Sequence, residues 1–186
     1  AGLVEPADHG RPYISQLILG AEGLLGIYRK THLSPPESAR YQSGASLPVF
    51  SAGEVVFGVQ LCYEAHFPEI STVMALKGAD ILLLPHASPR GEPTEKLDSW
   101  MRHLTGRAFD NGVFVVACNQ VGRNREDLIF PGVAVIIGPD GRADQQRPAR
   151  PRPGNPGETE AARLTLTSPY GLDFLASRHP QECRVG

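Results

Sequence analysis

Four short, almost continuously apolar runs are the feature that most constrains the fold of this 186-residue chain. They are EVVFGVQLC (54–62), DILLLP (80–85), VFVVAC (113–118) and VAVII (133–137). Runs of this length, rich in β-branched and aromatic residues, are typical of buried strands. The first two runs are each followed by a segment whose apolar residues have helical spacing. Strands that alternate with helices predict an α/β fold, with a mixed sheet whose faces are covered by helices.

The two helical segments carry recognisable start and stop signals. In FPEISTVMALKG (67–78), Pro68 suits the first helical position and Gly78 suits a C-terminal cap. The second segment, TEKLDSWMRHLTGRAFDNG (94–112), ends in Asn-Gly and includes Trp100 and Met101, which we expect in the core. Both segments are therefore predicted to be helices.

The segments outside this alternation have different compositions. YISQLILGAEGLLGIYRK (13–30) predicts a β-hairpin, whereas the proline-containing THLSPPESARYQSGASLP (31–48) predicts a loop. Residues 143–162 are rich in proline and arginine and have no aliphatic residue larger than alanine. They predict a solvated loop before a last strand, ARLTLT (162–167). We expect one domain that spans residues 1–186.

Composition excludes several classes of partner. A formal net charge of −2 and a pI near 6.3 argue against nucleic acid or an anionic membrane. No apolar run approaches the roughly 20 residues that span a bilayer, and the start does not resemble a signal peptide. Three cysteines without pair spacing predict a reducing, cytoplasmic location rather than a disulfide framework. The histidines lack zinc-ligand spacing and no phosphate-binding glycine loop is present, so we expect no metal and no cofactor.

Cys62 is the candidate nucleophile. It lies where a predicted strand ends and a helix is about to begin, and ligands gather at the carboxyl ends of strands in α/β sheets. A nearby helix N-terminus favours the thiolate, so we expect a lowered Cys62 pKa. The alternative is a small buried hydrophobic residue, a common role for free cysteine. Cys118 and Cys183 have no comparable setting.

Lys30 and Glu37 are candidate helpers of the thiol. Lys30 ends the apolar hairpin and precedes the proline-containing loop, and Glu37 follows seven residues later. An ammonium close to Cys62 would favour the thiolate and could stabilise an oxyanion. The alternative for Lys30 is a solvated lysine at a strand end.

Histidines near Cys62 raise a second possibility, a Cys–His pair. His32, His66 and His86 are available, but the sequence identifies no convergent partner for any of them. The segment PHASPRGEP (85–93) is expected to line one wall of a site, where His86 and Arg90 could contact substrate; an ordinary surface loop is the alternative. His103 has no assigned role.

Five ordered blocks carry a family resemblance: GLLGIYRKTHL, FGVQLCYEAHFPE, GADILLLPHASP, NGVFVVACNQVG and FPGVAVIIGPDG. In this order, from about Gly2 to Gly141, the chain resembles the nitrilase superfamily of carbon–nitrogen hydrolases. The resemblance implies an α-β-β-α layered sandwich with mixed sheets. It also implies a Glu–Lys–Cys triad that forms a thioester with an amide, carbamoyl or nitrile substrate, and a homo-oligomeric assembly.

The resemblance implies a role for each matching residue. Cys62 corresponds to the nucleophile, Lys30 to the catalytic lysine, and Tyr63 to the residue whose backbone N–H helps to hold the oxyanion. Glu37 resembles an auxiliary glutamate found in some amidases of the family. Glu64 stands where many relatives have aspartate, and we expect it to orient the loop.

The resemblance also implies that N-terminal elements of the fold are missing here. The family's first glutamate, the general base, lies upstream of the block that contains Lys30, and Glu5 lies in a block that resembles a non-catalytic strand. The expected function is hydrolysis of an amide or N-carbamoyl compound. Alternatives are nitrile hydrolysis at the same site, a catalytically silent binding or assembly module, and a Cys–His peptidase.

Overall fold

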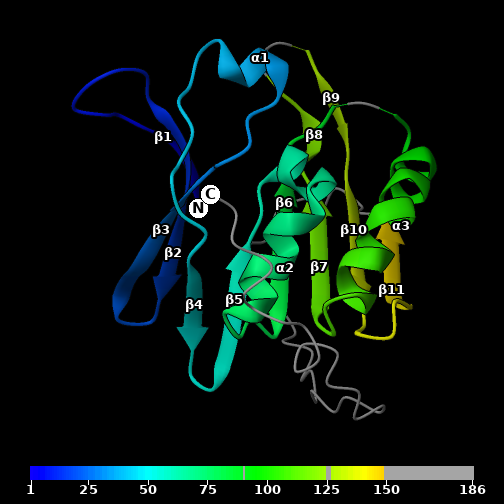
Figure 1. The fold of residues 1–186 in the computed structure, drawn as a ribbon. Helices are drawn as coiled ribbons and strands as arrows, with labels where there is room; N and C mark the ends of the chain where they lie inside the picture. Colours follow the sequence, from blue (N-terminus) through cyan, green and yellow to red (C-terminus); the bar gives the residue numbers. More distant parts are fainter. Residues whose placement is uncertain (90, 125–126, 149–186) are drawn as a thin grey trace.

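A computed structural model describes residues 1–89, 91–124 and 127–148 of the chain, which form a mixed α/β arrangement (Figure 1). The strands are β1 (Gly2–Glu5), β2 (Tyr13–Gly20), β3 (Gly23–Arg29), β4 (Val49–Ala52), β5 (Val55–Val59), β6 (Ile81–His86), β7 (Phe114–Asn119), β8 (Val121–Arg123), β9 (Ile129–Pro131), β10 (Val133–Ile137) and β11 (Ala143–Pro148). The helices are α1 (Pro35–Ser38), α2 (Pro68–Leu76) and α3 (Pro93–Phe109), with a 3-10 helix at Cys62–His66.

The larger sheet has six strands in the order β11-β10-β7-β6-β5-β4. The central strands β5, β6 and β7 are parallel, whereas β4, β10 and β11 pair antiparallel with their neighbours. Because parallel strands end at the same edge of a sheet, the segments that follow β5 and β6 emerge side by side. Cys62 follows β5, and His86 ends β6. The fold therefore brings Cys62 and His86, which are far apart in the sequence, to the same edge of the sheet.

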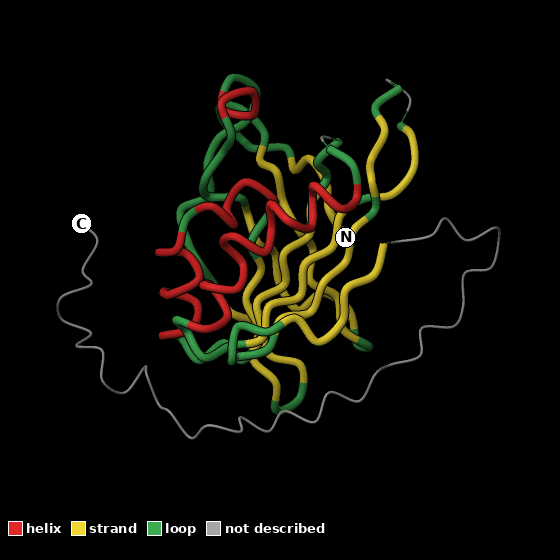
Figure 2. The backbone as a smooth tube through the Cα atoms, turned by 90° about the vertical axis from the view of Figure 1, so that its right-hand side faces the viewer, coloured by secondary structure: helices red, strands yellow, loops and turns green. Residues whose placement is uncertain are grey.

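Helices α2 and α3 lie on the same face of the large sheet (Figure 2). Ile70 and Met74 of α2 are buried there, as are Trp100 and Leu104 of α3. The contact with α2 requires glycine at position 58, because a Cβ atom there would meet the Met74 sulfur at 2.5 Å. A glycine in β5 thus allows α2 to approach the sheet closely.

The smaller sheet has the order β1-β2-β3 and is antiparallel throughout. Its strands β2 and β3 contribute Ile18 and Tyr28 to the core. Large apolar side chains of this sheet are also exposed, among them Val4, Leu19 and Leu24. Lys30 follows the last residue of β3, so this sheet determines where the lysine enters the site.

Most main elements agree with the sequence predictions, but helices were expected on the faces of the sheet, whereas α2 and α3 both lie on one face (Figure 2). The hairpin is β2–β3, the four apolar runs form β5, β6, β7 and β10, and Pro68 begins α2 as expected. The predicted loop at 31–48 also contains the short α1, and strand β4 was not predicted. Strand β4 forms a hairpin with β5 across Gly53, whose φ of +63° suits glycine.

The solvated-loop prediction for residues 143–162 is wrong at its beginning. Residues Ala143–Pro148 form β11, an edge strand that pairs antiparallel with β10. Edge pairing uses backbone N–H and C=O groups and does not require apolar side chains. The lack of large aliphatic residues in this segment therefore did not exclude a strand. The rest of that segment and the predicted strand at 162–167 lie outside the described residues. Within the described ranges, no helix is long and apolar enough to cross a membrane.

Candidate active site

Cys62 begins the 3-10 helix that follows β5 and has an unusual backbone conformation. Its φ is +52°, a left-handed value that residues with a side chain rarely adopt. Such a conformation costs on the order of 1–3 kcal/mol and persists only where the surrounding structure holds it. Contacts around Cys62 must therefore hold this turn in its strained conformation.

Glu64 holds the turn. Its side chain is fully buried, and its carboxylate accepts five hydrogen bonds. Oε2 accepts from the backbone N–H of Leu61 at 2.7 Å, and Oε1 accepts from the hydroxyl of Tyr28 at 2.7 Å. Oε1 also accepts from both the N–H and the hydroxyl of Thr31 and from the N–H of His32. One carboxylate thus connects the Cys62 turn to the segment that carries Lys30.

Lys30 and Glu37 form a bidentate ion pair. The Lys30 side chain is 2% exposed, and its Nζ lies 2.7 Å from both carboxylate oxygens of Glu37. Ser34 donates to Glu37 through its backbone N–H and its hydroxyl, each at 2.7 Å. Burial raises the pKa of Glu37, but the bonds from Lys30 and Ser34 outweigh it and leave this pKa lowered. Glu37 is therefore a carboxylate that fixes the position of the ammonium.

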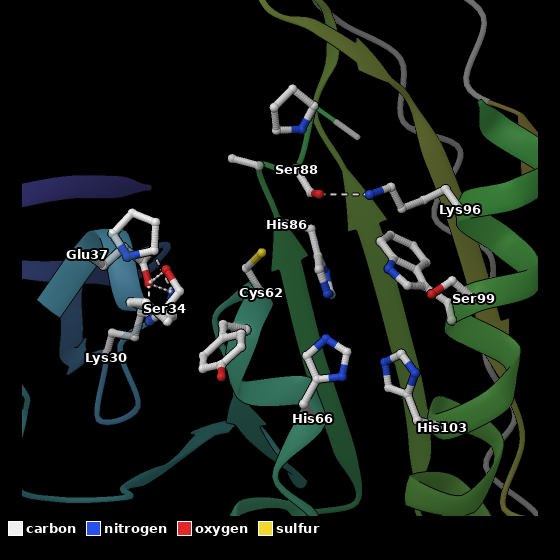
Figure 3. Close-up of a pocket in the computed structure, with 16 residues that line it drawn as sticks. Lys30, Ser34, Glu37, Cys62, His66, His86, Ser88, Lys96, Ser99 and His103 are labelled. Atoms are coloured by element: carbon white, nitrogen blue, oxygen red, sulfur yellow. Dashed lines mark hydrogen bonds and ion pairs between the residues drawn. The ribbon is translucent and has the colours of Figure 1, made fainter. Parts of the chain in front are cut away.

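A cavity of about 620 Å³ brings these groups together. The Lys30–Glu37 pair lies on one side, Cys62 lies in the middle, and side chains of α3 form the opposite side (Figure 3). The lining residues are Lys30, Ser34, Pro35, Pro36, Glu37, Cys62, Tyr63, His66, His86, Ala87, Ser88, Pro89, Lys96, Ser99, Trp100 and His103. A volume of this size accommodates a small organic substrate.

The expected lowering of the Cys62 pKa is not found. Burial raises the pKa of the thiol, and this outweighs the positive charge of Lys30 and the hydrogen bond that the N–H of Ala87 donates to the sulfur. The sequence shows charged residues near Cys62 but not the desolvation of its sulfur, which disfavours the thiolate. The resting group is therefore the thiol, and it must lose its proton before it can attack.

Three histidines line the cavity on the α3 side, and two are kept neutral by the protein. Burial lowers the pKa of His86 to about 4, and burial also lowers the pKa of His103 to about 4. The His86 Nδ1–H donates to the carbonyl of Leu84 at 2.8 Å, and the His66 and His103 ring centroids lie 4.8 Å apart. The described contacts include no hydrogen bond from Cys62 to a histidine, so nothing there supports a Cys–His pair.

The lowered pKa of His86 predicts acid sensitivity of the fold. Above pH 6.5 His86 is neutral in both states, whereas between pH 6.5 and about 4 only the unfolded chain binds its proton. Stability should therefore fall as the pH drops through this window, by about 2 kcal/mol at pH 5 from His86 alone. Urea unfolding at pH 7.5 and pH 5 should give a smaller difference for His86→Asn than for the parent. The exposed His9 provides the control variant His9→Asn, and equal pH dependence in both variants would contradict this account.

Of the other residues that the sequence raised, Tyr63 lies at the cavity and Cys118 does not. Tyr63 lies in the first turn of the 3-10 helix, where backbone N–H groups lack helical acceptors, and it lines the cavity. Cys118 is exposed on β7 and is not among the lining residues. Arg90 and Cys183 lie outside the described residues. Among the described residues, no cluster of three or more histidine, cysteine or acidic side chains could hold a metal ion.

Several residues of the site escaped the sequence analysis. Ser34 begins the pattern Ser-Pro-Pro-Glu, a capping box in which the serine and the glutamate bond each other. The sequence therefore contained a signal for the contact between Ser34 and Glu37. Ser88 and Lys96 line the cavity and bond each other, and buried Asn119 holds the Ser88 backbone. Ser88 belongs to the segment 85–93 that was expected to line one wall of a site, but no local pattern predicts its bonds to Lys96 and Asn119, because the three residues meet only in the folded chain.

The cavity thus combines a thiol, a buried lysine and a carboxylate at one edge of an α/β sheet. Residues 1–150 match the family model described as carbon-nitrogen hydrolase. The chain belongs to this family, in the nitrilase superfamily, as the resemblance implied.

Individual relatives support this membership. A probable nitrilase of Schizosaccharomyces pombe is 37% identical over 131 residues, which cover 70% of this chain and 46% of the relative. The N-carbamoylputrescine amidase of Arabidopsis thaliana is 33% identical over 89% of this chain and 57% of its own length. A solved amidase of Nesterenkonia, from the nitrilase superfamily, matches with a TM-score of 0.70 and 27% identity over 81% of this chain and 57% of its own.

These alignments also define how much of the family fold is present. The chain spans about half the length of the relatives it matches.

Structures of the Nesterenkonia amidase show acrylamide, or the acetamide moiety of fluoroacetamide, added at the active site cysteine of that protein.

Proposed function

We propose that this protein is a thiol hydrolase of non-peptide carbon–nitrogen bonds in amide or N-carbamoyl compounds. The observation that carries the proposal is that Cys62 and the buried Lys30–Glu37 pair line one cavity. Family membership supports it, since the relatives include amidases and N-carbamoylputrescine amidases.

In the first half of the reaction, the thiolate of Cys62 adds to the carbonyl carbon, and the carbonyl π electrons move to oxygen. The ammonium of Lys30 and the backbone N–H of Tyr63 stabilise this oxyanion. When the carbonyl re-forms, the C–N bond breaks, and ammonia or an amine leaves with a proton that originates from the thiol. A carboxylate must carry that proton; the resemblance assigns this role to the family's first glutamate, while Glu37, bonded to Lys30, holds the ammonium in place.

In the second half, water attacks the acyl carbon bonded to sulfur and the C–S bond breaks, which releases a carboxylic acid from an amide, or carbamic acid from an N-carbamoyl compound, and regenerates the thiol. Two easier addition–elimination steps at the same carbon replace a single difficult hydrolysis. Nitrile hydrolysis is an alternative at the same site, because the thiolate adds to a nitrile carbon in the same way.

A catalytically silent module is a second candidate function, and a specific observation favours it. Burial raises the pKa of Cys62, so the resting sulfur is not activated. Cavities of this kind can bind an amide without cleaving it, and the chain would then serve in binding or assembly.

We also propose that the small sheet belongs to the second sheet of an α-β-β-α sandwich in a homo-oligomeric protein. The support is that its apolar side chains Val4, Leu19 and Leu24 are exposed, and that the chain spans about half the length of its relatives.

Release of ammonia from a panel of amides, N-carbamoyl compounds and nitriles tests the proposed function. We expect turnover of amides or N-carbamoyl compounds by the parent and complete loss in Cys62→Ala, because no other sulfur lines the cavity among the described residues. Intact-mass spectrometry with a slow amide should reveal an acyl adduct on the parent alone.

Cys118→Ala is the matched control, since it removes an exposed thiol away from the cavity. Its rate should equal that of the parent. Equal rates for the parent and Cys62→Ala would rule out the thiol mechanism, and no turnover of any substrate by the parent would favour the silent module.

A further inference from the structure

The wall of the cavity opposite the Lys30–Glu37 pair carries a second cation. Lys96, in the first turns of α3, points into the cavity, and its Nζ donates to the hydroxyl oxygen of Ser88 at 2.7 Å (Figure 3). Cys62 lies between this group and Lys30 in the same view. A molecule whose reacting carbon is at Cys62 would therefore extend its other end toward Lys96.

Ser88 is held in place by a buried amide. Asn119, 8% exposed, accepts from the N–H of Ser88 at 2.9 Å and donates to its carbonyl at 3.0 Å. Because the Ser88 oxygen accepts from Lys96, its own hydroxyl proton can be donated to a ligand. The lysine and the serine thus form a pair of donors on a rigid support, which is suited to a carboxylate.

The charges of the lining show which ligand fits. Glu37 is the lining residue with a carboxylate, and it is bonded to Lys30. His86 and His103 are neutral near pH 7, because burial holds the pKa of each near 4. The positive charge of Lys96 also acts on the sulfur of Cys62 and lowers the pKa of this thiol. This end of the cavity therefore favours an anionic group over a neutral or cationic one.

We propose that Lys96 and Ser88 form an anion subsite that binds the carboxylate of a substrate whose amide or carbamoyl carbon lies at Cys62. The substrate class is then an acid amide, such as the monoamide of a dicarboxylic acid or an N-carbamoyl amino acid. The indole of Trp100 also lines the cavity, tilted by 41° against the His86 ring with centroids 4.5 Å apart, and offers apolar surface for the connecting carbons. The inference rests on the proposed function for its reaction, but not for its binding step.

Turnover kinetics test the subsite directly. We would compare monoamides of four- to six-carbon dicarboxylic acids with neutral amides of equal length and with amides that end in an amine. The acid amides should have the highest kcat/KM. In Lys96→Met the ratio of kcat/KM for acid and neutral amides should fall about 10- to 100-fold, mainly through KM, as expected for loss of a charged hydrogen-bond partner.

Three further variants separate the charge from the fold. Lys96→Arg should restore most of the preference, and Ser88→Ala should reduce it less than Lys96→Met. The surface variant Lys77→Met, which removes an ammonium bonded to the Leu47 carbonyl, should leave the ratio unchanged. A ratio that does not change in Lys96→Met would overturn the subsite.

Alkylation of Cys62 tests the subsite without turnover. The rates of modification by 3-maleimidopropionate and by N-ethylmaleimide can be followed at this cysteine by peptide mass spectrometry. Their ratio cancels any change in the thiol pKa, and it should fall in Lys96→Met but not in Lys77→Met.

Together, the two experiments distinguish failure of the hydrolase proposal from failure of the anion subsite. If no amide is hydrolysed but the alkylation ratio depends on Lys96, the hydrolase proposal fails and the anion subsite stands. If amides are hydrolysed but neither ratio depends on Lys96, the subsite fails and the hydrolase proposal stands.

Discussion

Replacing Lys30 with methionine is expected to lower the rate of amide hydrolysis by at least about 100- to 1000-fold, the usual cost of losing one oxyanion donor in a closed site. The fold should survive. Glu37 keeps its two hydrogen bonds from Ser34 and is 27% exposed, so water can solvate the carboxylate that the lysine leaves behind. The measurements are the steady-state rate and the thermal midpoint of the same preparation.

The Lys30→Met variant should also change the titration of the thiol. The charge of Lys30 is the strongest influence that lowers the pKa of Cys62, so this pKa should rise further when the charge is removed. The rate of N-ethylmaleimide alkylation against pH would report the shift, with Lys77→Met as the control. Hydrolysis within threefold of the parent rate would show that the Lys30 ammonium does not reach the reacting carbonyl.

Replacing Glu64 with alanine is expected to destabilise the fold by about 3–5 kcal/mol, a large part of the roughly 5–15 kcal/mol that stabilises a typical domain. The change leaves the donors of Leu61, Tyr28, Thr31 and His32 without their common acceptor. It also opens a void in a site that is fully buried. Urea unfolding should give the loss directly, and activity should disappear because the Cys62 turn and the Lys30 segment are no longer joined.

Two further variants separate the charge of Glu64 from its shape. Glu64→Gln keeps the oxygen that accepts from Tyr28 and Thr31, but it places an amide NH₂ against the N–H of Leu61. Its cost should be smaller, about 1–3 kcal/mol, as for one buried donor without an acceptor. Glu69→Gln changes an exposed glutamate close by and should alter stability by less than about 0.5 kcal/mol. Equal stability of the parent and Glu64→Ala would refute the role of Glu64 as the central acceptor.

Much of the fold was predictable because its signals are local. Apolar runs such as DILLLP (80–85) predict strands because such side chains pack well on a pleated, partly buried sheet, and Pro68 marks the start of α2 because its ring suits the first helical turn. Strand β11 was missed for the opposite reason. Its residues Ala143–Pro148 carry no apolar signal, and the strand forms only because β10 offers an unpaired edge.

The site was predictable to a smaller extent. The ordered blocks around Lys30 and Cys62 identified the two residues that carry the proposed chemistry, and the chain belongs to the family they indicated. The direction of the Cys62 pKa shift was wrong, because desolvation depends on how deeply the turn is buried and no neighbouring residue in the sequence reveals that.

The order of residues by itself determined the local elements, the family and the identity of the candidate nucleophile, since each depends on side chains that are neighbours in the chain. Only the tertiary structure decided that one carboxylate, Glu64, joins the turn of Cys62 to the segment of Lys30. The same holds for Lys96 and Ser88, which come from a helix and a loop and meet at one wall of the cavity. The physical reason is that hydrogen bonding and desolvation act over a few ångströms in space, and parallel strand pairing brings distant segments to one edge of the sheet.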